Sequence, residues 1–149
     1  MDGKRDTDMK KAAFYLLLAV LIASGAARAQ RLRAGEQILF LKSGDTVVGG
    51  IVDFSAPRMS LTLADGTEIT LRDLWLVNFV NEDWDFPQER NLIETGEHYV
   101  FLKSGDVASG RIVTLGGEPR AFEFETGERF PLGQIRRIYF SRTVPRGLR

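Results

Sequence analysis

The chain has 149 residues, in which 20 Lys and Arg are balanced by 20 Asp and Glu, with one His and no Cys. This balance argues against a nucleic-acid-binding protein, which normally carries a basic face with stacking aromatic residues. The lack of Cys excludes disulfides and thiol chemistry, and a single His leaves too few partners for a hydrolytic triad. We therefore expect a protein that is not an enzyme and needs no cofactor.

Residues 1–29 have the three-part layout of a secretory signal peptide. Two lysines precede an apolar run over residues 12–23, and residues 27–29 read Ala-Arg-Ala, a small-residue cleavage site. The run is shorter than the roughly 20 residues that a spanning helix needs, so we predict cleavage after residue 29, with a retained anchor as the alternative. Met9 stands directly before the lysines and is an alternative start. Export would place the mature protein in the periplasm or outside the cell.

The part of the chain that follows repeats itself. Residues 35–79 align with residues 96–140 without a gap, and 14 of these 45 positions are identical, which indicates a duplicated structural unit. We predict a first repeat over residues 30–80 and a second repeat over residues 96–142. An acidic linker, residues 81–95, joins them, and a basic C-terminal tail, residues 143–149, follows.

Each repeat predicts short β-strands, because apolar and polar residues alternate between turn signals of Gly, Asp and Pro. Gly49 and Gly50 fall inside the second strand and indicate a sharp bend there. The predicted fold class is all-β, with two tandem five-stranded barrels after a cleavable signal helix. The strands expected in the first repeat are residues 37–42, 46–54, 59–64, 67–71 and 75–80.

The apolar positions of these strands define the expected core, since alternate residues of a strand point to the same face. In the first repeat the core positions are Leu39, Leu41, Val47, Ile51, Leu61, Leu63, Ile69, Leu71, Leu74, Val77 and Phe79. In the second repeat they are Val100, Leu102, Ile112, Phe122, Phe124, Phe130, Leu132, Ile135, Ile138 and Phe140.

The first repeat also contains an ordered series of short motifs. Leu-Lys-Ser-Gly-Asp stands at residues 41–45, a bent Gly-containing strand follows, Met-Ser-Leu-Thr-Leu stands at residues 59–63, and Leu-Arg-Asp stands at residues 71–73. This order resembles the Sm-like, SH3-type small barrels, and the resemblance extends over both repeats. It implies two small barrels, which as tandem copies are expected to form a monomer or a dimer.

The resemblance does not extend to the RNA-binding residues of that family. Its RNA-binding members carry Asp and Asn in the middle motif and Arg-Gly in the late motif. This chain has Ser55 and Ser60 in the middle and Asp73 after the Arg. We therefore expect no nucleic-acid partner.

The two repeats differ most informatively at Trp75 and Leu76, which align with a pair of arginines in the second repeat. Because both residues lie between core positions, at least one should point outward and form a contact surface. Trp84 and Phe86 continue this apolar series through the linker. We predict that these four residues bind a protein partner; the alternative is that they form internal packing.

The second repeat offers a basic patch, with Arg136, Arg137 and Arg142 as its candidate residues. Such a patch suggests binding of a cell-wall polymer or an anionic lipid as the alternative function. The linker, residues 81–95, contains five acidic residues and one basic residue. It could instead dock against these arginines or against Arg146.

Other polar groups are better explained by structure than by chemistry. His98 aligns with Gln37, so an amide serves at the same place, and we expect neither metal binding nor general-base catalysis there. Residues 81–85 crowd oxygen ligands together but lack the Gly and the distal Glu of a calcium loop, so we predict no metal site. The leading hypothesis is a non-enzymatic exported interaction or structural module with a protein partner in the bacterial envelope.

Overall fold

The computed structural model describes residues 31–82, 86–94 and 96–145, with residues 86 and 87 described by their backbone alone. The predicted signal peptide, residues 1–29, and also Trp84 and Arg146 lie outside the described residues. From Arg31 onward the chain forms one compact unit. No helix in these ranges has the length and apolar character needed to cross a membrane.

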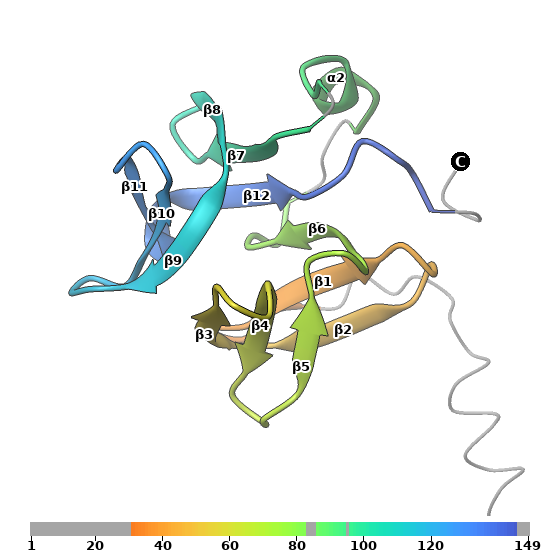
Figure 1. Cartoon of the computed structure of the whole chain (residues 1–149). Coiled ribbons are helices and arrows are strands. Elements are labelled where there is room, and N and C mark those ends of the chain that lie inside the picture. Colours follow the sequence, from red (N-terminus) through yellow and green to blue (C-terminus); the bar gives the residue numbers. More distant parts are fainter. Residues whose placement is uncertain (1–30, 83–85, 95, 146–149) are drawn as a thin grey trace, which may run out of the picture. The chain divides into compact units, whose positions relative to one another are not determined.

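The described residues are all-β apart from one short α-helix and one 3-10 turn, which confirms the predicted fold class at that level (Figure 1). Each repeat contributes six strands in the same order. The first repeat contains β1 (Gln37–Leu41), β2 (Thr46–Gly49), β3 (Ile51–Ser55), β4 (Ser60–Leu63), β5 (Glu68–Thr70) and β6 (Leu74–Asn78). After α2 (Phe86–Asn91), the second repeat contains β7 (His98–Leu102), β8 (Val107–Gly110), β9 (Ile112–Gly116), β10 (Ala121–Phe124), β11 (Arg129–Pro131), η1 (Leu132–Gln134) and β12 (Ile135–Tyr139).

The strand positions agree with those predicted, and the count differs for a local reason. The predicted second strand is interrupted at Gly50, where the bend was expected, and its counterpart is interrupted at Arg111. The bend directs the two halves into different sheets, so one continuous segment becomes two strands. Five predicted strands per repeat are therefore six in the structure.

The repeated Lys-Ser-Gly-Asp segments form matching hairpin turns. Gly44 and Gly105 adopt φ angles of 98° and 97°, which other residues rarely tolerate. The Ser43 hydroxyl donates to the Asp45 carboxylate at 2.8 Å, and Ser104 donates to Asp106 at 2.9 Å. These serines complete turns, as their position in the sequence predicts.

The twelve strands form three sheets. One has six strands in the order β2-β1-β6-β12-β7-β8, and the other two have the orders β3-β4-β5 and β11-β10-β9. None of them closes into a barrel, so the two-barrel prediction is not confirmed. The physical reason is that β6 and β12, the last strands of the two repeats, pair with each other and join the repeats into one sheet (Figure 1).

The pairing of β6 with β12 relates the two repeats by a local pseudo-twofold axis. Val77 lies opposite Ile138, and these two residues occupy equivalent positions of the repeat. Beyond the strand ends, the Phe79 amide donates to the Arg136 carbonyl at 2.9 Å. The equivalent bond runs from the Phe140 amide to the Trp75 carbonyl, also at 2.9 Å. The interface between repeats is thus self-complementary, as in a twofold dimer.

The core of the protein is shared by both repeats. All 21 predicted core positions belong to a single hydrophobic cluster, together with Phe54, Ala108 and Leu115, which confirms the predicted set. Val77 and Ile138, at the pseudo-twofold axis, are fully buried within this cluster. Each repeat therefore completes its core only with the other, as expected for units too small to bury enough apolar surface alone.

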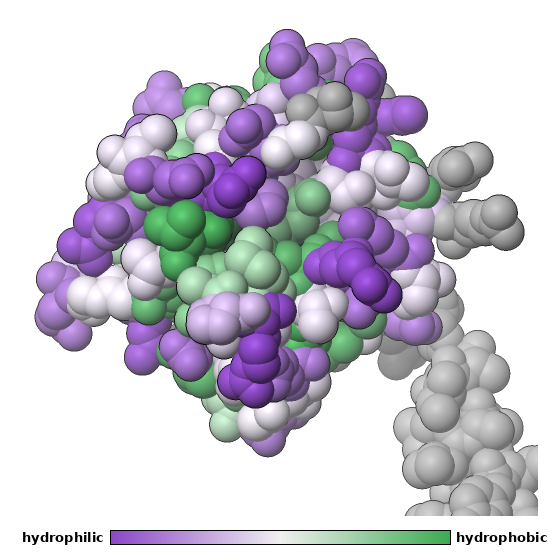
Figure 2. All heavy atoms as spheres, in the orientation of Figure 1, coloured by the Kyte–Doolittle hydropathy of each residue, from purple (hydrophilic) through white to green (hydrophobic). Residues whose placement is uncertain are grey.

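The surface seen in the orientation of Figure 1 is mixed in character. Hydrophobic residues reach the surface near the centre of this face, and hydrophilic residues surround them (Figure 2). Partly buried members of the core cluster include Phe79 and Leu132. Some side chains of the core cluster therefore remain partly exposed to solvent.

We expect Gly110→Ala to destabilise the protein by about 1–3 kcal/mol, the usual cost of overpacking a core. A Cβ on Gly110 would lie 2.6 Å from Cδ2 of Phe124, a ring that is buried and cannot move aside. Gly116→Ala is the control, because nothing lies within 4 Å of a Cβ there. Urea unfolding of both variants would contradict this packing if the two substitutions had equal effects.

Candidate functional site

The predicted exposed aromatic pair is buried. Trp75 and Leu76 are 2% and 0% exposed, so the prediction that at least one of them forms an open contact surface is wrong. They belong to a second hydrophobic cluster, separate from the main core. Its other members are Phe40, Ile93, Tyr99, Phe101, Tyr139 and Val144.

A β-bulge explains why two adjacent residues face the same cluster. Leu74 lies opposite Leu41 and Leu76 lies opposite Phe40, which leaves Trp75 as an extra residue in β6. Such an extra residue interrupts the alternation of side chains between the two faces of a strand. Trp75 and Leu76 therefore point away from the main core, as expected, but towards a face that the chain itself covers.

Segments outside the repeats supply that cover. Ile93, after α2, and Val144, after β12, are both buried in the second cluster. Trp75 packs edge-on against Phe40 and Tyr139, with ring centroids 6.2 and 6.3 Å apart. For these residues, the alternative of internal packing is the one that the structure supports. Phe86 lies at the start of α2, and its side chain is outside the described atoms.

Arg137 is also buried, at 2% exposed, and is not part of a surface patch. Its Nε donates to both carboxylate oxygens of Glu89 at 2.9 Å, and its Nη2 donates to Oε1. The Tyr139 hydroxyl donates to the second oxygen of the same carboxylate. Glu89 of α2 is thereby held on the sheet by two residues of β12.

The predicted basic patch is accordingly divided. Arg136 is half-buried and forms a salt bridge of 3.8 Å with Glu82, whereas Arg142 is exposed. Two of the three arginines therefore contact the acidic linker. The hypothesis that the linker docks against these arginines is confirmed for Arg136 and Arg137.

We expect Glu89→Ala to destabilise the protein by about 3–5 kcal/mol, because it removes the carboxylate that forms a salt bridge with the buried Arg137. Replacing both partners with Leu, the residue that the first repeat carries at position 76, should recover much of this loss. Glu82→Gln should have a much smaller effect, since the bridge to Arg136 is exposed to solvent. Chemical denaturation would contradict this account if the double variant were less stable than Glu89→Ala.

His98 has a structural role that matches its counterpart. Its Nδ1 accepts the backbone N–H of Ile112 at 3.1 Å, and Oε1 of Gln37 accepts the equivalent N–H of Ile51 at 2.8 Å. Burial, and secondarily the charge of Arg111, lowers the pKa of His98 below its ordinary value of 6.5. The folded protein therefore favours the neutral imidazole, which alone can accept this hydrogen bond.

The lowered pKa predicts a loss of stability in acid. The folded state binds the proton of His98 less readily than the unfolded chain, so the contribution of this group is complete above about pH 6.5 and is lost as the pH falls. His98→Gln keeps an acceptor that does not titrate. As the pH is lowered from 7.5 to 5, the stability of the variant relative to the original protein, measured by urea unfolding, should thus rise. A difference that does not change with pH would contradict the assignment.

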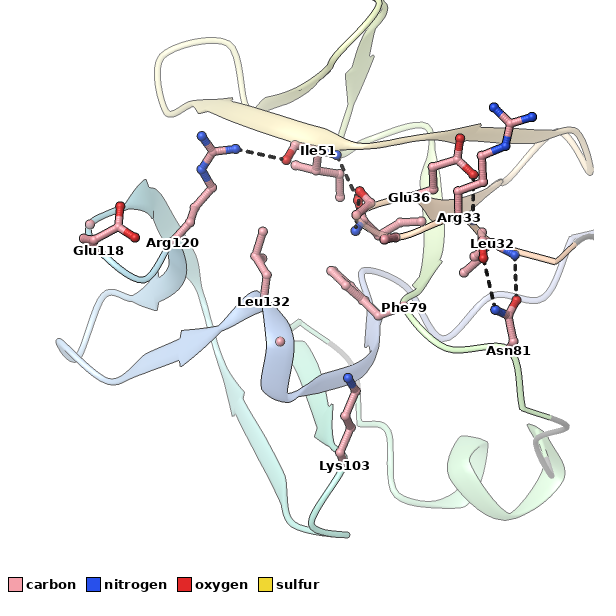
Figure 3. Close-up of a pocket in the computed structure, with 15 residues that line it drawn as sticks. Leu32, Arg33, Glu36, Ile51, Phe79, Asn81, Lys103, Glu118, Arg120 and Leu132 are labelled. Carbon is pink, nitrogen blue, oxygen red and sulfur yellow. Dashed lines mark hydrogen bonds between the residues drawn. The ribbon is translucent and has the colours of Figure 1, made fainter.

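A groove of about 640 Å³ lies where residues of the two repeats meet, and sequence reasoning did not find it. Phe79 and Leu132 point into it from opposite repeats, with Ile51 facing them (Figure 3). The segment before β1 forms one wall. Asn81 holds that segment through two hydrogen bonds with the backbone of Leu32, at 2.7 and 3.3 Å.

The rim of the groove carries charges of both signs. Arg33, Lys103 and Arg120 line it together with Glu36 and Glu118. Arg120 donates to the Ile51 carbonyl at 3.5 Å (Figure 3). The exposed lining of the groove is thus mostly polar, with Phe79 and Leu132 as its partly exposed apolar side chains.

The pseudo-twofold axis relates this groove to a smaller hollow of about 240 Å³. Glu97 and Phe140 line the hollow where Glu36 and Phe79 line the groove. The residues equivalent to Lys103 and Arg120, which are Lys42 and Met59, do not line the hollow. The two sites have therefore diverged, and the only signal of this in the sequence is the difference between the repeats at such positions.

No metal centre is found among the residues that the structure describes, where no group of three or more His, Asp or Glu side chains could hold an ion. Asn81 and Glu82 of the acidic segment instead contact Leu32 and Arg136. Comparison with family models, curated proteins and solved structures finds no match to this chain. The proposals below therefore depend on the geometry of the chain itself.

Proposed function

We propose that the protein is a non-enzymatic, exported interaction module that binds a protein partner in the bacterial envelope. The observation that carries this proposal is the groove between the repeats, in which Phe79 and Leu132 lie beside charged residues of both signs. The groove takes the place of the aromatic pair as the contact surface, because Trp75 and Leu76 are covered by the chain itself.

Each repeat is proposed to be a modified Sm-like or SH3-type barrel. The bent segment formed by β2 and β3 corresponds to the bent second strand of such barrels, and β4, β5 and β6 follow it in the same order. In this chain the last strands pair with each other, which occupies the edges that such units would otherwise present.

Binding of a cell-wall polymer or an anionic lipid is the less favoured candidate. It depended on Arg136, Arg137 and Arg142 acting as one patch. Arg137 is buried against Glu89 and Arg136 contacts Glu82, so only Arg142 of the three is fully available to such a ligand.

A photo-crosslinking residue at position 120 should trap an envelope protein in cells, because Arg120 is exposed on the rim of the groove. The matched control is position 59, which is equivalent in the first repeat and is also exposed but lies outside the groove. Mass spectrometry would identify the trapped protein. The proposal fails if position 120 traps no protein, or if both positions trap the same proteins equally.

A further inference from the structure

We infer that the groove binds an extended acidic peptide segment. A carboxylate of this segment would lie near Lys103 and Arg120, and a neighbouring apolar side chain would pack on Phe79 and Leu132. This inference rests on the proposed function, since it names the chemistry of the partner that the groove accepts.

The charged groups of the rim support an anionic ligand. Arg33, Lys103 and Arg120 form no salt bridge with any residue in the described ranges, although Glu36 and Glu118 line the same groove. The Glu36 carboxylate accepts the backbone N–H of Arg33 at 2.9 Å. Three cations from three separate segments therefore line the groove, and within the described ranges no ion pair neutralises their charge.

Two apolar side chains of the groove can contact an apolar side chain of the ligand. Phe79 and Leu132 are only partly buried, and both pack against the main core below them. The wall opposite is held in place by the two hydrogen bonds between Asn81 and Leu32. A site that is already formed loses less conformational entropy when a ligand binds.

Comparison of the two repeats supports the same ligand. The smaller hollow has Glu94 where the groove has Arg33, and it lacks a counterpart of Lys103 on its rim. The axis that relates the two sites preserves Phe79 and Glu36 as Phe140 and Glu97. The hollow in turn has Arg142 where the groove has Asn81. The groove is therefore lined by three cations and two carboxylates and the hollow by one cation and two carboxylates, which favours a negatively charged ligand at the groove.

A peptide fits the groove better than a membrane surface. Glu36 and Glu118 stand on the rim beside the cations, so a plane of anionic headgroups would meet both attraction and repulsion. An extended segment can place single carboxylates next to the cations and apolar side chains on Phe79 and Leu132. We therefore infer a peptide in which acidic and apolar residues alternate.

The test measures fluorescence anisotropy of a labelled decapeptide of alternating Asp and Leu, titrated with the protein purified from the cells that produce it. We expect saturable binding that weakens as NaCl is raised, because opposite charges near a surface are screened. The same peptide with Lys in place of Asp should not bind. Vesicles of phosphatidylglycerol should not compete with the acidic peptide.

Lys103→Gln and Lys42→Gln form a matched pair of variants. The two lysines occupy the same position of the Leu-Lys-Ser-Gly-Asp turn in their respective repeats, and both substitutions remove one charge. Only Lys103 lines the groove. We expect Lys103→Gln to weaken binding about five-fold and Lys42→Gln to leave it unchanged. Arg120→Met, which copies the residue of the first repeat, should weaken binding to a similar extent.

Equal losses from Lys103→Gln and Lys42→Gln would overturn the inference, since the effect would then follow net charge alone. No binding of the acidic peptide, or binding of the vesicles in its place, would also overturn it. These outcomes leave the proposed function standing if position 120 still traps a protein in cells. Failure of that crosslink would instead count against the interaction module itself.

Discussion

The antiparallel pairing of β6 with β12 is the contact on which the rest of this structure depends. It places Val77 against Ile138 at the centre of a six-stranded sheet and joins two short repeats around one core. A unit of about 50 residues buries too little apolar surface to be stable by a wide margin. Pairing the last strands adds buried area and also removes two strand edges that would otherwise remain open.

This pairing has consequences on both faces of the six-stranded sheet. On one face it creates the common core, and the groove forms where the two repeats meet above it. On the other face it brings Trp75 close to Tyr139, so that an apolar surface arises which neither repeat covers. The linker and the C-terminal segment cover this surface, and the carboxylate of Glu89 compensates the charge that Arg137 brings into it.

Two differences between the repeats have a clear structural meaning. Leu76 and Arg137 are equivalent, but only Arg137 can hold the acidic linker. Gln37 and His98 are also equivalent and accept the same hydrogen bond, so the two repeats keep one local structure with either side chain. The two repeats thus share one backbone arrangement, although most of their aligned positions carry different residues.

Much of this fold follows from the sequence alone, because strand periodicity, turn glycines and an ungapped repeat are local signals. They predict the strands, the bend at Gly50 and all 21 core positions. The burial of Trp75 and Leu76 could not be predicted, because it depends on a bulge in β6 and on cover by the linker segment that contains Ile93. The groove likewise depends on how one repeat meets the other. The sequence by itself determines the residues of the main core, because they follow strand periodicity. Only the tertiary structure decides whether residues such as Trp75 and Leu76 are buried and which segment covers them, because that depends on contacts between residues far apart in the chain.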